Sequence, residues 1–125
     1  VVIAYKERKK ANVIEEMFLI GDVEGKNVVL IDDMIDTAGT LCKAAQILKE
    51  KGALSVRAMA THGVLSGKAY ENIENSVMEE VIVTDTIPLK SNCTSKIKVI
   101  SCAPLFAEVM KMVHEHQSIS SKFII

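Results

Sequence analysis

Aromatic residues are scarce in this chain. They make up 4% of its 125 residues, and tryptophan is absent. Because hydrophobic residues still make up 49% of the sequence, the core has to be built from Val, Ile, Leu, Met and Ala. A chain of this length can bury enough of these side chains to fold as one domain without disulfide or metal cross-links. Four methionines are assigned to this core: Met17, Met59, Met110 and Met112.

Cysteines are few as well. Cys42, Cys93 and Cys102 are odd in number, and no two of them are spaced as Cys-x-x-Cys. This pattern disfavours a disulfide framework and a zinc site, and it favours a reducing compartment. We therefore expect a cytoplasmic protein.

Long apolar runs and an excess of either charge are also missing. No run approaches the roughly 18 apolar residues that span a bilayer, and the first ten residues are apolar and then basic, the reverse of a signal peptide. The 15 Lys and Arg residues nearly balance the 16 Asp and Glu residues, so we expect no general attraction to nucleic acid or membranes. Since the chain begins with Val1 inside a strand-like segment, we expect it to be a fragment of a longer protein.

Short β-branched segments alternate with amphipathic helical segments. The sequence predicts strands at 1–5, 13–23, 28–31, 56–61, 81–84 and 96–101, and helices at 40–51, 68–75 and 104–114. This alternation predicts an α/β fold, in which a mostly parallel sheet carries helices on both faces.

Residues 28–40, with the sequence VVLIDDMIDTAGT, join a predicted strand to a predicted helix. Open α/β sheets bind ligands at the carboxyl ends of their strands. Small residues at such a junction leave backbone N–H groups open, the helix dipole adds positive potential, and glycine permits close approach. Four residues are therefore predicted to hold a phosphate: Thr37, Ala38, Gly39 and Thr40.

Three carboxylates stand before this segment and would repel the same phosphate. Asp32, Asp33 and Asp36 need hydroxyl groups that donate to them, or a cation. A sugar phosphate satisfies both halves of the site, with its diol on the aspartates and Mg²⁺ nearby. An acidic pair after a strand more often caps a helix or stays solvated, but the whole constellation favours the sugar phosphate.

Other phosphate sites match less well. The chain contains neither GxxxxGK[ST] nor GxGxxG, and Met34 stands where a haloacid-dehalogenase-type site needs its second aspartate. A signalling receiver domain would also place an acidic pair after an aliphatic strand, with Asp85 as its phosphoacceptor. It would need a Lys-Pro after its last strand, where this chain reads VISCAPL.

Segments spread along the whole chain repeat the motifs of one known family. GDVEGKNVVLIDDMIDTAGT is similar to its phosphoribosyl-diphosphate-binding signature, and YKERKKANVIEEM is similar to its catalytic loop, where Lys-x-Arg precedes Asn-Val. ATHGVLSGKA, VTDTIP and a C-terminal Ser-x-Ser recur in it too. The chain thus resembles the ribose-phosphate diphosphokinases (phosphoribosyl-diphosphate synthetases), which have a type I phosphoribosyltransferase fold. The resemblance implies that residues 1–125 are a C-terminal domain whose N-terminal partner domain is absent.

The resemblance implies a reaction of nucleotide biosynthesis. The C1 hydroxyl of ribose 5-phosphate attacks Mg-ATP, receives its diphosphoryl group and releases AMP. Ribose 5-phosphate would bind to the aspartates and small residues of segment 28–40, while Lys6 and Arg8 would neutralise charge on the transferring phosphates. Glu7 departs from the family pattern, and without the resemblance this basic run would be a solvated turn.

The resemblance also implies regulation and assembly. Ser118 and Ser120 match a Ser-x-Ser that helps to bind a regulatory phosphate or ADP, although a plain polar tail would look the same. The family forms dimers that assemble into hexamers. Since its ATP site is shared with the N-terminal domain and a neighbouring subunit, we expect this chain to be inactive alone, and we assign no metal ligand within it.

Two other interpretations stay open. The chain would also suit another type I phosphoribosyltransferase, or a non-catalytic relative or receiver-like module. His62, which follows a predicted strand, is expected to have a structural rather than a catalytic role.

Overall fold

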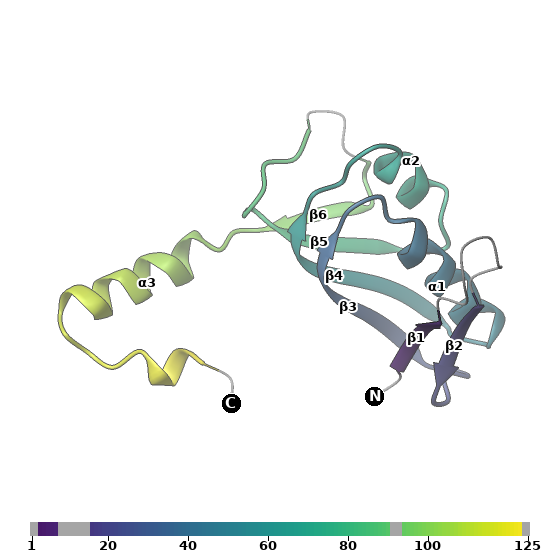
Figure 1. Cartoon of the computed structure of the whole chain (residues 1–125), viewed down its shortest axis with the longest axis horizontal. Coiled ribbons are helices and arrows are strands. Elements are labelled where there is room, and N and C mark those ends of the chain that lie inside the picture. The colour runs from purple at the N-terminus through teal and green to yellow at the C-terminus, as the bar shows by residue number, and fades with distance from the viewer. Residues whose placement is uncertain (1–2, 8–15, 91–93, 124–125) are drawn as a thin grey trace.

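The computed structural model describes residues 3–7, 16–90 and 94–123, with β1 and β2 described by their backbone alone (Figure 1). β1 (Ile3–Glu7) and β2 (Glu16–Ile20) form an antiparallel pair. A separate four-stranded sheet is parallel, in the order β3-β4-β5-β6. Its strands are β3 (Asn27–Ile35), β4 (Ser55–Gly63), β5 (Glu80–Thr84) and β6 (Ile97–Ile100). The helices are α1 (Gly39–Glu50), α2 (Ala69–Glu74) and α3 (Ala103–His114), with a 3₁₀ turn, η1, at Ser120–Lys122.

The predicted α/β order and the parallel sheet are confirmed. β3 is longer than the predicted strand at 28–31, because it begins at Asn27 and extends to Ile35. Its second half pairs with an equally long β4, in which Ala60 lies opposite Asp32 and His62 opposite Met34. The acidic pair therefore belongs to the strand rather than to the loop after it, and the pleat sends its two side chains to opposite faces.

One face of the sheet is covered by α1 and α2, which also contact each other. The core between them contains fully buried side chains from both layers: Leu48, Val56, Ile73, Val81 and Val83. Sequential strand order combined with right-handed crossovers places every connecting helix on the same side of the sheet. This rule explains why α1 and α2 share a face.

The opposite face of the sheet carries no helix among the described residues. Ile31 is 82% exposed there, and Met59 and Ile82 lie beside it in register. The expectation of helices on both faces is therefore not met. The last helix, α3, follows the edge strand β6 and extends away from the sheet (Figure 1), and none of its residues is buried.

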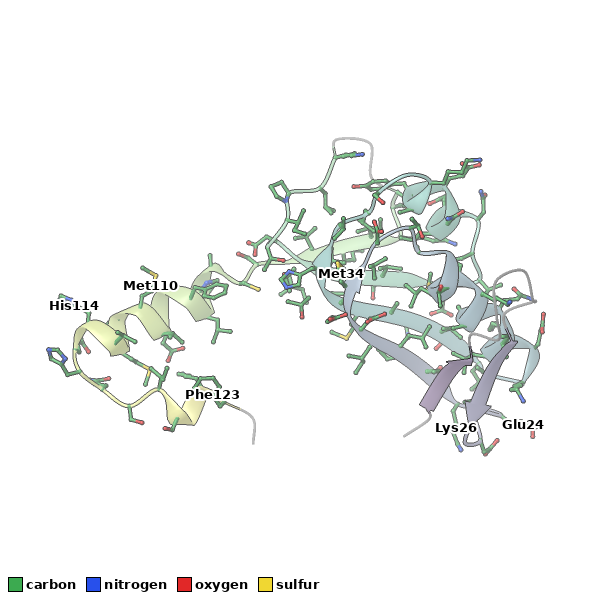
Figure 2. All side chains as sticks on the ribbon, in the orientation of Figure 1. Glu24, Lys26, Met34, Met110, His114 and Phe123 are labelled. Carbon is green, nitrogen blue, oxygen red and sulfur yellow. The ribbon has the colours of Figure 1, made fainter. Side chains whose placement is uncertain are left out.

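The methionine assignments need correction for the same reason. Met59 lies on the uncovered face, and Met110 is 70% exposed on α3, far from the sheet (Figure 2). Met112 is partly buried, and the side chain of Met17 lies outside the described residues. Among the side chains that the structure describes, the methionine that fills the core is Met78, which is 1% exposed.

None of the helices in the described ranges has the length and apolar character that a bilayer crossing requires.

Candidate functional site

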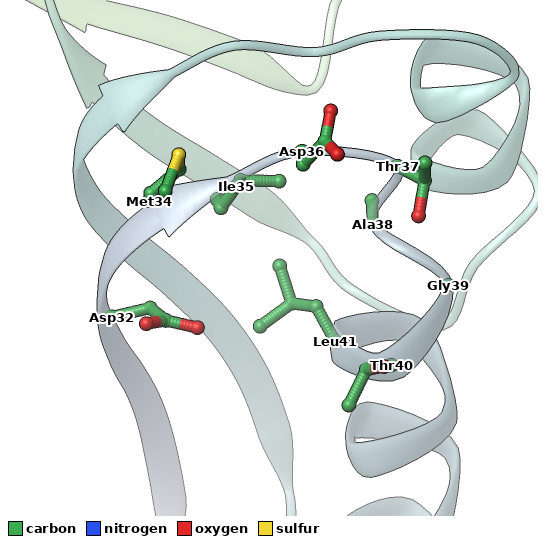
Figure 3. A pocket seen from close by; sticks show the side chains of 9 residues that line it. All are labelled: Asp32, Met34, Ile35, Asp36, Thr37, Ala38, Gly39, Thr40 and Leu41. Carbon is green, nitrogen blue, oxygen red and sulfur yellow. The ribbon is translucent and has the colours of Figure 1, made fainter.

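A pocket of about 180 Å³ lies at the carboxyl end of β3, where the chain turns into α1 (Figure 3). Its lining comes from one continuous segment and comprises Asp32, Met34, Ile35, Asp36, Thr37, Ala38, Gly39, Thr40 and Leu41. Six of the seven residues predicted to bind a sugar phosphate are in this set. The structure thus brings together the carboxylates and the small residues that the sequence singled out.

The small residues present open backbone donors. Ala38, which precedes α1, has φ 60° and ψ 1°, and α1 has no side-chain cap. No hydrogen bond within the described residues is donated by the backbone N–H groups of residues 37–41. Free N–H groups at a helix N-terminus, beside a left-handed residue, form a concave arrangement that suits an anion.

The carboxylates lie on the other side of the same pocket. The Asp32 side chain points into it (Figure 3). Asp32 Oδ1 accepts a hydrogen bond of 2.9 Å from the N–H of Asp33. Asp36 Oδ1 accepts one from the hydroxyl of Ser66. Each carboxylate keeps its second oxygen without a partner among the described residues, and these two oxygens can accept hydrogen bonds from alcohols.

Asp33 is the predicted residue that the pocket does not include. Asp32 pairs with the buried Ala60 on the helix-covered face, so the alternation of the strand directs Asp33 to the uncovered face. The sequence could not distinguish the two aspartates, because their assignment depends on which face α1 covers.

Two residues that the sequence did not suggest hold this segment from behind. Asn72, in α2, donates its side-chain N–H to the carbonyl of Thr37 at 2.9 Å. Ser66, in the β4–α2 loop, donates its backbone N–H to the carbonyl of Asp36 at 3.2 Å and its hydroxyl to the Asp36 carboxylate. Both follow the pocket residues by about thirty positions, so no local pattern reveals them.

Cys42 lies at the contact between α1 and α2. Its thiol donates to the carbonyl of Asn72 at 3.4 Å. Burial raises the pKa of the Cys42 thiol, so the group stays protonated and helps to join the two helices at neutral pH. Cys102 is likewise a free cysteine, and Cys93 lies outside the described residues.

Only one member of the predicted catalytic pair lies within the described residues, and that residue is away from the pocket. Lys6 lies in β1, opposite Met17 of β2, and Arg8 lies outside the described residues. The β1–β2 pair is near the beginning of β3 (Figure 1), whereas the pocket is at the end of that strand.

The remaining candidates make local contacts. His62 Nδ1 lies 2.9 Å from the hydroxyl of Thr86, in keeping with the structural role expected of it. In the C-terminal segment, the Ser118 hydroxyl lies 3.0 Å from that of Ser120 and also accepts from the N–H of Ser120 at 3.3 Å. The Ser-x-Ser pair is therefore a compact turn that leads into η1, whose first residue is Ser120.

Comparison with known proteins decides the family. A model of the phosphoribosyl synthetase-associated domain matches residues 4–124. The chain belongs to this family. Among its relatives, a ribose-phosphate pyrophosphokinase of Wolinella succinogenes is 58% identical over 98% of this chain and 40% of its own length. A protein of the same name from Campylobacter jejuni is 57% identical over 99% of this chain and 40% of its own length.

A solved member confirms the fold. The crystal structure of phosphoribosylpyrophosphate synthetase from Mycobacterium smegmatis superposes with a TM-score of 0.79 at 38% identity, over 90% of this chain and 37% of that one. The resemblance to the diphosphokinase family noted in the sequence is thus confirmed. The chain spans about two-fifths of the length of the curated relatives that it matches.

Proposed function

We propose that this chain is the sugar-phosphate-binding part of a ribose-phosphate diphosphokinase that serves nucleotide biosynthesis. In this proposal residues 1–125 are its C-terminal domain, and the partner domain lies in the rest of a longer protein. One observation carries the proposal: the pocket at the end of β3 places open backbone amides opposite two carboxylate oxygens without partners. That pairing complements a phosphate and a diol on one small molecule.

The division of roles follows from charge. The 5-phosphate of ribose 5-phosphate accepts hydrogen bonds from the amides of residues 37–40 and from the hydroxyls of Thr37 and Thr40. Asp32 and Asp36 accept hydrogen bonds from the ribose hydroxyls, and Asp33 joins them only if the ligand reaches the uncovered face. This arrangement leaves the C1 hydroxyl at the open side of the pocket.

The proposed reaction transfers a diphosphoryl group. The C1 oxygen forms a bond to the β-phosphorus of ATP, the bond from that phosphorus to the bridging oxygen of AMP breaks, and the hydroxyl proton passes to solvent. Phosphoryl chemistry of this kind depends on positioning and on stabilisation of charge. We assign the second task to Lys6 and Arg8, which have to approach the pocket from the β1–β2 segment in the complete enzyme.

Mg²⁺ is expected to arrive with ATP. Searching residues 3–7, 16–90 and 94–123 reveals no group of three or more His, Cys, Asp or Glu side chains that could hold a metal ion. We assign no metal ligand within this chain, and we derive no step through the metal.

Three properties of the complete protein complete the proposal. It is a cytoplasmic homo-oligomer, in keeping with the family's dimers and hexamers. Ser118 and Ser120 contribute to a site for a regulatory phosphate or ADP. The chain by itself binds ribose 5-phosphate but releases no AMP, because the ATP site needs the other domain and a neighbouring subunit.

The test is a binding comparison on this chain. Thermal shifts and calorimetry are measured with ribose 5-phosphate, with a nucleoside monophosphate, as another phosphoribosyltransferase would prefer, and with beryllofluoride, as a receiver would prefer. We expect ribose 5-phosphate to stabilise the chain most. Asp32→Asn should weaken its binding about tenfold, whereas Asp22→Asn, which removes an exposed charge elsewhere, should not. A stronger response to either of the other two ligands would reject the proposed substrate. Release of AMP by the isolated chain would reject the proposal that the chain is inactive by itself.

A further inference from the structure

The carbonyl groups behind the pocket are held in a regular way. The N–H of Leu65 donates to the carbonyl of Ile35 at 3.1 Å, and the N–H of Ser66 donates to that of Asp36 at 3.2 Å. The side chain of Asn72 then donates to the carbonyl of Thr37 at 2.9 Å. Three successive carbonyl groups are thus held by three donors from the segment between β4 and the middle of α2.

This arrangement determines where the next amides point. In a trans peptide the C=O of one residue and the N–H of the next point in opposite directions, and the described residues contain no cis peptide bond. Since the carbonyls of Asp36 and Thr37 face the β4–α2 segment, the N–H groups of Thr37 and Ala38 face away from it. The pocket is on that other side, because its lining includes Thr37 and Ala38 but no residue of the β4–α2 segment.

The three donors differ in what a substitution can remove. Leu65 and Ser66 donate from the backbone, so a side-chain change leaves these donors in place. Asn72 donates from its side chain. The carbonyl that it binds belongs to Thr37, the residue just before the left-handed Ala38. A left-handed alanine persists only where its surroundings enforce it, and Asn72 supplies the contact on its N-terminal side.

We propose that Asn72 is a positioning residue, which turns the Thr37–Ala38 peptide so that the Ala38 N–H serves the phosphate of the sugar. Asn72 touches no ligand and acts through the Thr37 carbonyl. The inference rests on the proposed function, since it assumes that an anion occupies this pocket. It adds a determinant of affinity that lies on a different helix.

The position of Asn72 is itself well supported. Its own carbonyl accepts from the Cys42 thiol of α1 at 3.4 Å. The end of α2 is held by Lys96, whose Nζ lies 2.8 Å from the carbonyls of Glu74 and Ser76. These contacts join α2 to α1 and to the segment before β6, so the Asn72 amide is held by a rigid part of the fold.

The test uses ¹⁵N- and ¹³C-labelled chain with and without inorganic phosphate and ribose 5-phosphate. Asn72→Ala removes the donor, and Asn72→Asp keeps the shape but places an acceptor against the Thr37 carbonyl. Asn75→Ala is the matched control, because Asn75 is an exposed residue of the same helix region whose side chain makes none of the hydrogen bonds described. In both Asn72 variants, we expect Ala38 to lose the ¹³C chemical shifts that report its left-handed backbone conformation. We also expect both variants to bind phosphate about tenfold more weakly, whereas the control should show neither effect.

The possible outcomes separate the two proposals. If both Asn72 variants keep the wild-type Ala38 shifts and the wild-type affinity for phosphate, the positioning role is wrong. If the Asn72 effects appear but wild type binds ribose 5-phosphate no better than inorganic phosphate, the positioning role holds and the proposed substrate is wrong. A wild-type chain that binds neither anion would overturn both.

Discussion

The carboxylate of Asp85 accepts a hydrogen bond of 2.8 Å from the backbone N–H of Cys102, at the residue before α3 begins. Its other oxygen accepts one from the Ser101 hydroxyl. Asp85 thus binds the residue that precedes α3 and caps this end of the helix. Both of its oxygens have hydrogen-bond partners, whereas the phosphoacceptor of a receiver domain would need a free oxygen. The sequential strand order also differs from the receiver order, in which the first strand lies between the second and the third. Together with the family match, these findings reject the receiver interpretation.

Acid should weaken this cap. The hydrogen bond from the Cys102 N–H, followed by that from the Ser101 hydroxyl, lowers the pKa of Asp85 below its usual 3.8. Because the pKa is lower in the folded state, the cap stabilises the fold above pH 3.8, and this contribution is lost as the pH falls through the folded-state pKa. Carboxyl ¹³C titration should place this pKa below 3.8, and Asp85→Asn should reduce the loss of stability in acid. A pKa at or above 3.8 would contradict the capping role.

Gly39→Ala should separate stability from binding. A Cβ at Gly39 would meet only the Thr37 hydroxyl, at 4.0 Å, so alanine in the first turn of α1 should stabilise the fold by up to about 1 kcal/mol. The same methyl group would crowd an anion at the open amides, so affinity for ribose 5-phosphate should fall. Chemical denaturation and calorimetry measure the two effects.

Gly25→Ala is the control for that experiment. Gly25 has φ 68° in a turn remote from the pocket, so alanine there should cost about 1 kcal/mol through strain and leave the affinity unchanged. Equal affinity of wild type and Gly39→Ala would show that no ligand approaches Gly39.

Lys96→Met should destabilise the fold by about 1–2 kcal/mol. The methionine keeps the apolar stem but removes the ammonium group that lies 2.8 Å from two carbonyls at the end of α2. Lys98→Met, at an exposed position of β6, should change the free energy of unfolding by no more than about 0.5 kcal/mol. Urea titrations of the two variants measure the difference, and similar values for both would rule out the capping role of Lys96.

The methionines offer a direct check of the layer arrangement. Met78→Ala should cost about 2–5 kcal/mol because it leaves a cavity in the core, whereas Met110→Ala on α3 should stay within about 0.5 kcal/mol. Their exposed fractions, 1% and 70%, are the reason for the contrast. A large loss of stability in Met110→Ala would mean that α3 packs against other parts of the protein in solution.

Local chemistry explains what could be predicted. The alternation of strands and helices depends on patterns a few residues long, and the elements from β3 to α3 lie within a few residues of their predicted bounds. The junction at residues 32–40 was identified because charge, small size and a following helix are all encoded in one short stretch. The residues of this junction line one pocket because the chain turns there from β3 into α1, and no contact with a distant segment is needed to bring them together.

The sequence by itself determined the order of the elements, the parallel sheet and the segment that carries the pocket, because these follow from short-range pattern and charge. Only the tertiary structure decided that Asp32 rather than Asp33 lines the pocket and that Asn72 holds the Thr37 carbonyl. It also decided that one sheet face carries no helix from the part of the chain that the structure describes. The physical reason is that these features depend on strand pairing, on the alternation of side chains along the paired strands and on the handedness of the crossover connections. All three involve segments about thirty residues apart, so no local pattern in the sequence reveals them.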